Sequence, residues 1–164
     1  MNTGKLPNEL MNKLLAKIHS KDPRVILGPS LGEDAAIIAM ENRNLVVSSD
    51  PITFTSTDIG WYSVHINAND IATRGAKPLW FLATILAPPD TNESTIENVL
   101  SQIKETCNSL EIELVGGHTE ITEGVTNLIV SGTMLGETIN NTILRTSNIK
   151  SGDSILLTSI SALR

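Results

Sequence analysis

The segment from Gly60 to Ala87 has the sequence GWYSVHINANDIATRGAKPLWFLATILA and changes character in its middle. Its first part, up to Arg74, predicts a helix, which Gly75 and the later Pro78 bring to an end. Its second part, Leu79 to Ala87, is a nearly unbroken apolar run, and such a run predicts a strand buried in a sheet. The segment therefore indicates a sheet that carries a helix on one face.

Helices and strands are also expected on both sides of this segment. A helical apolar stripe predicts a helix from Leu6 to Ile18, and we expect Asp90 to cap a third helix with Glu93 in a capping-box arrangement. The strands are expected at Ala35–Met40, Leu45–Ser49, Glu111–Val115, Val125–Leu135 and Ile155–Thr158, and the loops at 28–32, 51–58 and 116–120. This order predicts an α+β domain with a mainly antiparallel sheet and its helices on one face.

The composition limits the classes of protein that the sequence can represent. Of the 164 residues, 40% are hydrophobic and only 3% are aromatic, so we expect a core built mostly from Ile, Leu, Val and Ala. The net charge of -6 and the absence of a basic run exclude a non-specific nucleic-acid binder. The longest apolar run is too short to span a membrane. The single cysteine, Cys107, and the lack of a signal-peptide pattern at the start predict a cytoplasmic protein.

The predicted helix in the opening segment carries short polar side chains on one face. Asn67, Asp70 and Arg74 are three and four residues apart, so they share a side of the helix, while Ala68 and Ala72 leave room for close packing. A solvated helix face more often carries Lys and Glu. The pattern therefore favours a binding site, with an ordinary solvated face as the alternative.

Two aspartates follow structural transitions in the first third of the chain. Asp34 comes after a loop in which Gly28 and Gly32 leave backbone N–H groups free to face an anion. A metal or phosphate contact and a solvated turn are both compatible with this position. Asp50 ends a predicted strand, and the same two alternatives hold for it.

A second group of polar residues lies in the later half of the sequence. His118, in a glycine-led loop, either contacts phosphate or metal or is a hydrogen-bonded structural residue, and Glu120 offers another carboxylate. Arg145 pairs either with phosphate or with a surface acid. The sequence has no P-loop, dinucleotide-binding GxGxxG, HExxH or CxxC motif, which argues against a conventional P-loop NTPase and a zinc hydrolase.

Taken together, these segments resemble the N-terminal domain of the aminoimidazole ribonucleotide synthetase superfamily. Five stretches match the family's motifs in order: Gly32-Glu33-Asp34-Ala35-Ala36, Val46 to Asp50, Val64 to Pro78 with Asn67 and Asp70, Val115 to Glu120, and Leu144-Arg145 followed by Gly152-Asp153. Within the superfamily, the sequence is most similar to the hydrogenase-maturation-like and thiamine-phosphate-kinase-like members.

The resemblance implies a fold, a cofactor and a set of site residues. The family's N-terminal domain dimerises through its sheet into a shared β-barrel, and ATP and Mg²⁺ bind in clefts near that interface. The implied metal ligands are Asp34, Asp50 and Asp70. The implied nucleotide-binding residues are Gly32, Asp34, Ser48, Ser49, Asn67, Gly117 and Arg145. We therefore expect a homodimeric domain of an ATP-dependent synthetase or kinase that activates a small-molecule oxygen nucleophile; the alternative is a non-catalytic nucleotide-binding or scaffold member.

Three departures from the family pattern qualify this expectation. Glu33 stands where the family has Asp, and His118 stands where the kinase branch has Asp. The third departure is length, because the family's C-terminal domain does not follow. We expect an N-terminal helical segment at 1–27, the ATP-binding domain at 28–158, and a truncated end at 159–164. Such a fragment is expected to be inactive without its C-terminal domain.

Overall fold

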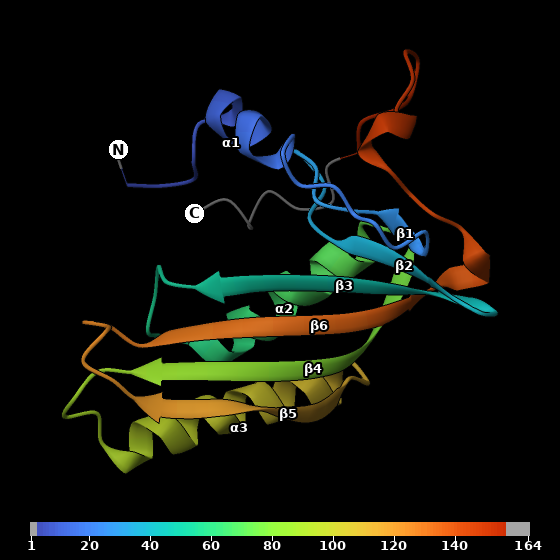
Figure 1. Ribbon diagram of the computed structural model, residues 1–164. Helices are drawn as coiled ribbons and strands as arrows, with labels where there is room; N and C mark the ends of the chain where they lie inside the picture. The colour runs from blue at the N-terminus through green and yellow to red at the C-terminus, as the bar shows by residue number, and fades with distance from the viewer. Residues whose placement is uncertain (1–2, 157–164) are drawn as a thin grey trace.

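The computed structural model describes residues 3–156, which contain one six-stranded sheet and three α-helices (Figure 1). The strands are β1 Val25–Leu27, β2 Ala36–Met40, β3 Arg43–Ile52, β4 Ala76–Ala87, β5 Glu113–Ile121 and β6 Ile129–Thr138. The helices are α1 Asn8–Leu15, α2 Ile59–Ala72 and α3 Glu93–Ser109, and short 3-10 helices occupy Ile139–Asn141 and Thr146–Asn148. The expected α+β class is confirmed.

The sheet has the strand order β1-β2-β3-β6-β4-β5. Every neighbouring pair is antiparallel except β4 and β5, which are parallel and are joined by α3 as a crossover. Strand β6, the last in sequence, lies between β3 and β4. In this register one row of paired residues crosses β3, β6, β4 and β5; it consists of Asp50, Gly132, Ala83 and Gly117.

Helices α2 and α3 cover one face of the sheet, and α1 lies apart from them near the β1–β2 edge (Figure 1). Helix α2 approaches the sheet closely because β6 has glycines beneath it. A Cβ atom on Gly132 would lie 2.7 Å from the ring of Phe81 and would overlap the Asn67 amide. The core between the layers is mainly aliphatic, with Phe81 as its single fully buried aromatic side chain among the described residues.

The opposite face of the sheet is less covered. Along β4 the residues Phe81, Ala83, Ile85 and Ala87 are buried, whereas the alternate residues are only half-buried. Strand β6 shows the same alternation. Within residues 3–156 the sheet is open: β1 and β5 are its two edge strands, and it is not closed into a barrel. None of the helices in the described part of the chain combines the length and the apolar character that a membrane span needs.

Several predicted boundaries are wrong at the edges of the elements. The first helix starts only after Pro7 and spans Asn8–Leu15, shorter than expected. Strand β3 is longer than expected and includes Pro51, which pairs with Ser131, so the loop starts after Ile52. Strand β6 begins at Ile129 because residues 123–127 form turns.

One strand was missed, and three further predictions about elements need correction. Strand β1 was not predicted, since three residues give no usable periodicity. Asn92, and not Asp90, caps α3: its side chain accepts a hydrogen bond from the Thr95 N–H at 2.9 Å, while Asp90 adopts a left-handed turn conformation. The stretch 116–120 is not a loop but the middle of β5. Of the predicted last strand, Ile155 and Leu156 are not in a strand, and the remainder lies outside the described residues.

Candidate functional site

Asn67 is the centre of a hydrogen-bond network that joins α2 to the end of β3. Its side chain is fully buried. Its Oδ1 accepts a hydrogen bond from the Asp50 N–H at 2.9 Å, and its Nδ2 donates to the carbonyl oxygens of Asp50 at 3.2 Å and Ser63 at 2.8 Å. One amide thus satisfies both backbone groups of Asp50, and it fixes the position of that residue at the sheet edge.

A second contact joins the same two elements. The Ser48 hydroxyl donates to Oδ2 of Asp70 at 2.9 Å. Burial raises the pKa of Asp70 to about 6, and the negative charges of Asp50 and Asp34 push it in the same direction, while the hydrogen bond from Ser48 and the charge of Lys5 lower it. Asp34 and Asp50 therefore lie close enough to Asp70 for their charges to act on its carboxyl group.

The carboxylates of Asp34 and Asp50 belong to exposed residues, and neither makes a side-chain hydrogen bond or ion pair with the described residues. Within residues 3–156 no three His, Cys, Asp or Glu side chains are arranged to hold a metal ion by themselves. Mg²⁺ commonly binds through one or two carboxylates, with phosphate oxygens and waters as its other ligands. The oxygen-only donor set fits a magnesium ion that arrives with a phosphate group.

The loop that carries Asp34 is held in place by its neighbour Glu33. The Glu33 carboxylate forms an ion pair with Arg74 at the end of α2, and both side chains are almost fully buried, at 8% and 5% exposed. The same carboxylate accepts a hydrogen bond from the Thr146 N–H at 3.2 Å, and the Thr146 hydroxyl donates to the Gly32 carbonyl at 2.9 Å. The first and last predicted motifs therefore lie side by side.

Other predicted site residues have structural partners of their own. Ser49 lies on the opposite side of β3 from Ser48, since successive strand residues alternate, and its hydroxyl donates to the Gly132 carbonyl at 2.9 Å. Arg145 donates from Nη2 to the Ile26 carbonyl at 3.1 Å. These contacts place Ser49 and Arg145 near the candidate site's strands without joining them to the three acids.

Gly117 and His118 lie in β5, three strands away from Asp50. Gly117 and Asp50 lie in the same row of paired residues, and three inter-strand spacings of the usual size separate them by about 14 Å. Gly117 has φ +155°, and a Cβ there would collide with the Ala83 carbonyl oxygen, so the sheet itself requires glycine. His118 Nε2 lies 3.2 Å from a Glu120 oxygen on the exposed strand. The structure therefore does not bring Gly117 together with the acids within one chain.

Sequence reasoning missed the pairing of Glu33 with Arg74. Both residues were noticed, one as a departure from the family motif and the other as part of the polar face of α2. Their contact joins positions 41 residues apart, and no local pattern reveals such a pair. The only signal in the sequence is an arginine on a helix face that otherwise carries short side chains.

A comparison with known protein families matches the part of the chain that contains this candidate site. Residues 32–138 match the family described as AIR synthase related protein, N-terminal domain. The chain belongs to this family. The matched range contains the three acids, Asn67 and both helices that cover the sheet.

Curated relatives of this AIR synthase-related domain are longer than the chain. A putative hydrogenase expression/formation protein of Methanocaldococcus jannaschii is 28% identical over 160 residues, which cover 94% of the chain and 48% of the relative. A thiamine-monophosphate kinase of Pyrococcus abyssi is 31% identical over 137 residues, which cover 79% of the chain and 43% of the relative. The chain thus spans less than half the length of either.

Solved structures share the fold of the AIR synthase-related domain. The complex described as AaThiL with AMPPCP and TMP has a TM-score of 0.62 at 25% identity, covering 79% of this chain and 40% of that one. The hydrogenase maturation protein HypE in complex with ATP has a TM-score of 0.61 at 20% identity, covering 80% and 40%. Structural neighbours have therefore been crystallised with ATP or AMPPCP.

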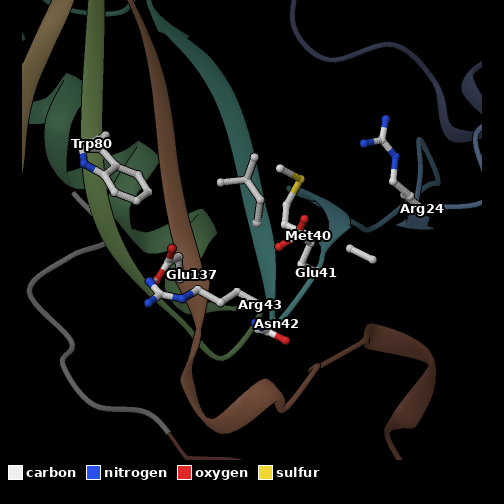
Figure 2. Close-up of a pocket in the computed structure, with 9 residues that line it drawn as sticks. Arg24, Met40, Glu41, Asn42, Arg43, Trp80 and Glu137 are labelled. Carbon is white, nitrogen blue, oxygen red and sulfur yellow. Dashed lines mark hydrogen bonds and ion pairs between the residues drawn. The ribbon is translucent and has the colours of Figure 1, made fainter.

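A separate cavity of about 490 Å³ lies at the opposite end of β3 from Asp50 (Figure 2). Two of its lining residues, Arg43 and Glu137, form an ion pair at 2.7 Å. Its other labelled residues in Figure 2 are Arg24, Met40, Glu41, Asn42 and Trp80. None of the predicted site residues lines this cavity, so it is distinct from the site built around Asn67.

Proposed function

We propose that this AIR synthase-related domain binds ATP together with Mg²⁺ and forms the nucleotide-binding half of an ATP-dependent kinase or synthetase. The observation that carries the proposal is the junction of β3 and α2, where Asn67 fixes Asp50, Ser48 fixes Asp70, and Asp34 adds a third negative charge. A cation here would offset the negative charge that Asp34 and Asp50 place on Asp70, and Mg²⁺ bound to phosphate supplies one.

The site residues take different roles in this proposal. Asp34, Asp50 and Asp70 would hold Mg²⁺, which when bound neutralises charge on the transferred phosphoryl group. Gly32 and Asp34 would contact the nucleotide from the loop, and Gly117 and Arg145 from more distant segments. Ser48 and Asn67 act mainly as supports, because their side chains are already hydrogen-bonded to Asp70 and to the backbone of Asp50. Ser49 would contact nucleotide from the other side of the sheet.

We also propose that the domain works as a homodimer. The half-buried apolar residues on the open face of β4 and β6 support this proposal, since a second copy would cover them and two open sheets together would form the expected barrel. We also propose domain limits of 28–158, with an N-terminal segment at 1–27 and an end at 159–164. The matched family range of 32–138 lies inside these limits and supports the central one.

The reaction class is proposed from the relatives. One is named as a thiamine-monophosphate kinase and another as a putative hydrogenase expression/formation protein. We propose that the complete protein uses ATP to phosphorylate or activate a small-molecule oxygen nucleophile. A non-catalytic nucleotide-binding or scaffold role is the alternative, and it predicts ATP binding without turnover or no ATP binding.

Calorimetric titration with ATP, with and without Mg²⁺, tests this function on both the 164-residue chain and the full-length protein. We expect the full-length protein to bind ATP and to require Mg²⁺ for tight binding. Equal affinity with and without Mg²⁺ would refute the assignment of the three acids. A full-length protein that binds no ATP would favour the scaffold role.

A further inference from the structure

We infer that Glu33 is a positioning residue that acts through Arg74, and that only its neighbour Asp34 faces the ligand. The inference rests on the proposed function, since it assigns different roles to the two adjacent acids of the Gly32-Glu33-Asp34 motif. Pattern alone does not separate these roles, because both side chains carry the same charge in neighbouring positions of one loop.

Both oxygens of Glu33 already have partners. Oε2 accepts from Nη1 of Arg74, and Oε1 accepts from the Thr146 N–H at 3.2 Å. The side chains of Glu33 and Arg74 are 8% and 5% exposed. A carboxylate with both oxygens engaged and little access to solvent is poorly placed to bind a metal ion or to face phosphate. Asp34 is exposed and makes no side-chain hydrogen bond with the described residues.

The contacts of Glu33 join three segments that are far apart in sequence. They are the loop that carries Asp34, the turn that follows α2 and the 3-10 helix at Thr146–Asn148. Arg74 comes four residues after Asp70, in the turn that follows the last residue of α2, Ala72. The pair thus fixes the loop of Asp34 relative to the turn of Asp70, and it holds the chain next to Arg145 against both.

A buried ion pair responds in a characteristic way to substitution. Removal of one partner leaves the other charge buried and unpaired, which is strongly destabilising, whereas replacement of both partners by apolar residues is often neutral. This asymmetry distinguishes a Glu33 that holds the loop in position from a Glu33 that binds the metal ion. An apolar pair can still hold the loop, but it supplies no oxygen to a metal ion.

The test uses four variants of the full-length protein: Glu33→Gln, the double variant Glu33→Leu with Arg74→Met, Asp34→Asn, and Asp22→Asn. The last breaks an exposed pair with Arg24 and serves as the control. Calorimetry measures Mg²⁺-dependent ATP affinity. Hydrogen exchange of the unliganded protein measures the protection of residues 28–34 and 145–148, and thermal unfolding verifies that each variant folds.

We expect Glu33→Gln to increase hydrogen exchange in both segments and to weaken ATP binding about tenfold, which corresponds to about 1.4 kcal/mol. The double variant should restore the protection of residues 28–34 and most of the affinity, but not the protection of the Thr146 N–H, whose acceptor it removes. Asp34→Asn should lose affinity with normal protection. Asp22→Asn should match the wild type in both measurements.

Two results would overturn the inference. One is unchanged exchange in Glu33→Gln. The other is a folded double variant that binds ATP as weakly as Asp34→Asn, since that would make the Glu33 oxygen itself a ligand. If the wild type binds no ATP but Glu33→Gln still loosens both segments and the double variant restores residues 28–34, the proposed function fails and the positioning role stands.

Discussion

At the scale of single residues, Asn67 shows why a short polar side chain lies on the buried side of α2. The sequence correctly marks Asn67 and Asp70 as an unusual helix face. It does not reveal that the Asn67 amide is used to hold the backbone of Asp50, because that contact depends on where β3 ends. The pairing of Glu33 with Arg74 is hidden for the same reason. Local pattern identifies candidate side chains, and only tertiary contacts separate supports from ligands.

Asp70→Asn tests the electrostatics of the junction. Burial, followed by the charges of Asp50 and Asp34, raises the pKa of Asp70 from 3.8 to about 6. The folded protein therefore binds this proton more tightly than the unfolded chain, and the free energy of unfolding falls as pH rises from about 4 to about 6. We expect the variant to be more stable than the wild type at about pH 8, with a smaller difference at about pH 4.

Thermal unfolding at the two pH values measures this effect in the absence of nucleotide and metal. Glu97→Gln, which changes an exposed carboxylate on α3, is the matched control and should show no such pH dependence. An Asp70→Asn variant whose stability differs from the wild type by the same amount at both pH values would contradict the expected cause.

At the scale of elements, the sequence predicts the helices and the long strands well, but it ends β5 at Val115, before the glycines that the strand includes. A Gly-Gly pair is more typical of a turn than of a strand. The structure overrides this preference because β4 offers a full parallel partner, and because a side chain at Gly117 would collide with the Ala83 carbonyl. Strand β1 and the extension of β3 through Pro51 likewise depend on neighbouring strands.

Gly132→Ala tests the close approach of α2 to β6. The added Cβ would lie 2.7 Å from the Phe81 ring and would overlap the Asn67 amide. Because neither neighbour can move without disturbing the core, we expect a loss of about 1–3 kcal/mol in the free energy of unfolding, measured by urea denaturation. Gly124→Ala is the control, since its nearest contact would be the Thr122 hydroxyl at 3.5 Å. Equal effects of the two substitutions would show that α2 does not pack against Gly132 as described.

At the scale of the whole molecule, the open face of the sheet sets the expectation of a homodimer. We expect the wild type to have the mass of a dimer by light scattering at micromolar concentration. Leu82→Glu, which places a charge on the half-buried open face of β4, should give a monomer because a charge is costly to bury in such an interface.

Leu100→Glu is the matched control for this experiment, because Leu100 is an exposed leucine on α3, in the helical layer. It should remain a dimer. A monomeric wild type, or a Leu82→Glu variant with the mass of the wild type, would contradict association through the open face.

The position of β6 between β3 and β4 has a consequence for how the chain folds. During synthesis β3, α2, β4, α3 and β5 all emerge before the strand that must separate β3 from β4. Until β6, Ile129 to Thr138, is available, β3 and β4 have no strand that pairs with both of them. The buried side of α2 then packs against only part of the sheet. Such non-local pairing slows folding. Asp50, at the proposed nucleotide-binding junction, therefore gains its strand partner Gly132 only after β6 has entered the middle of the sheet.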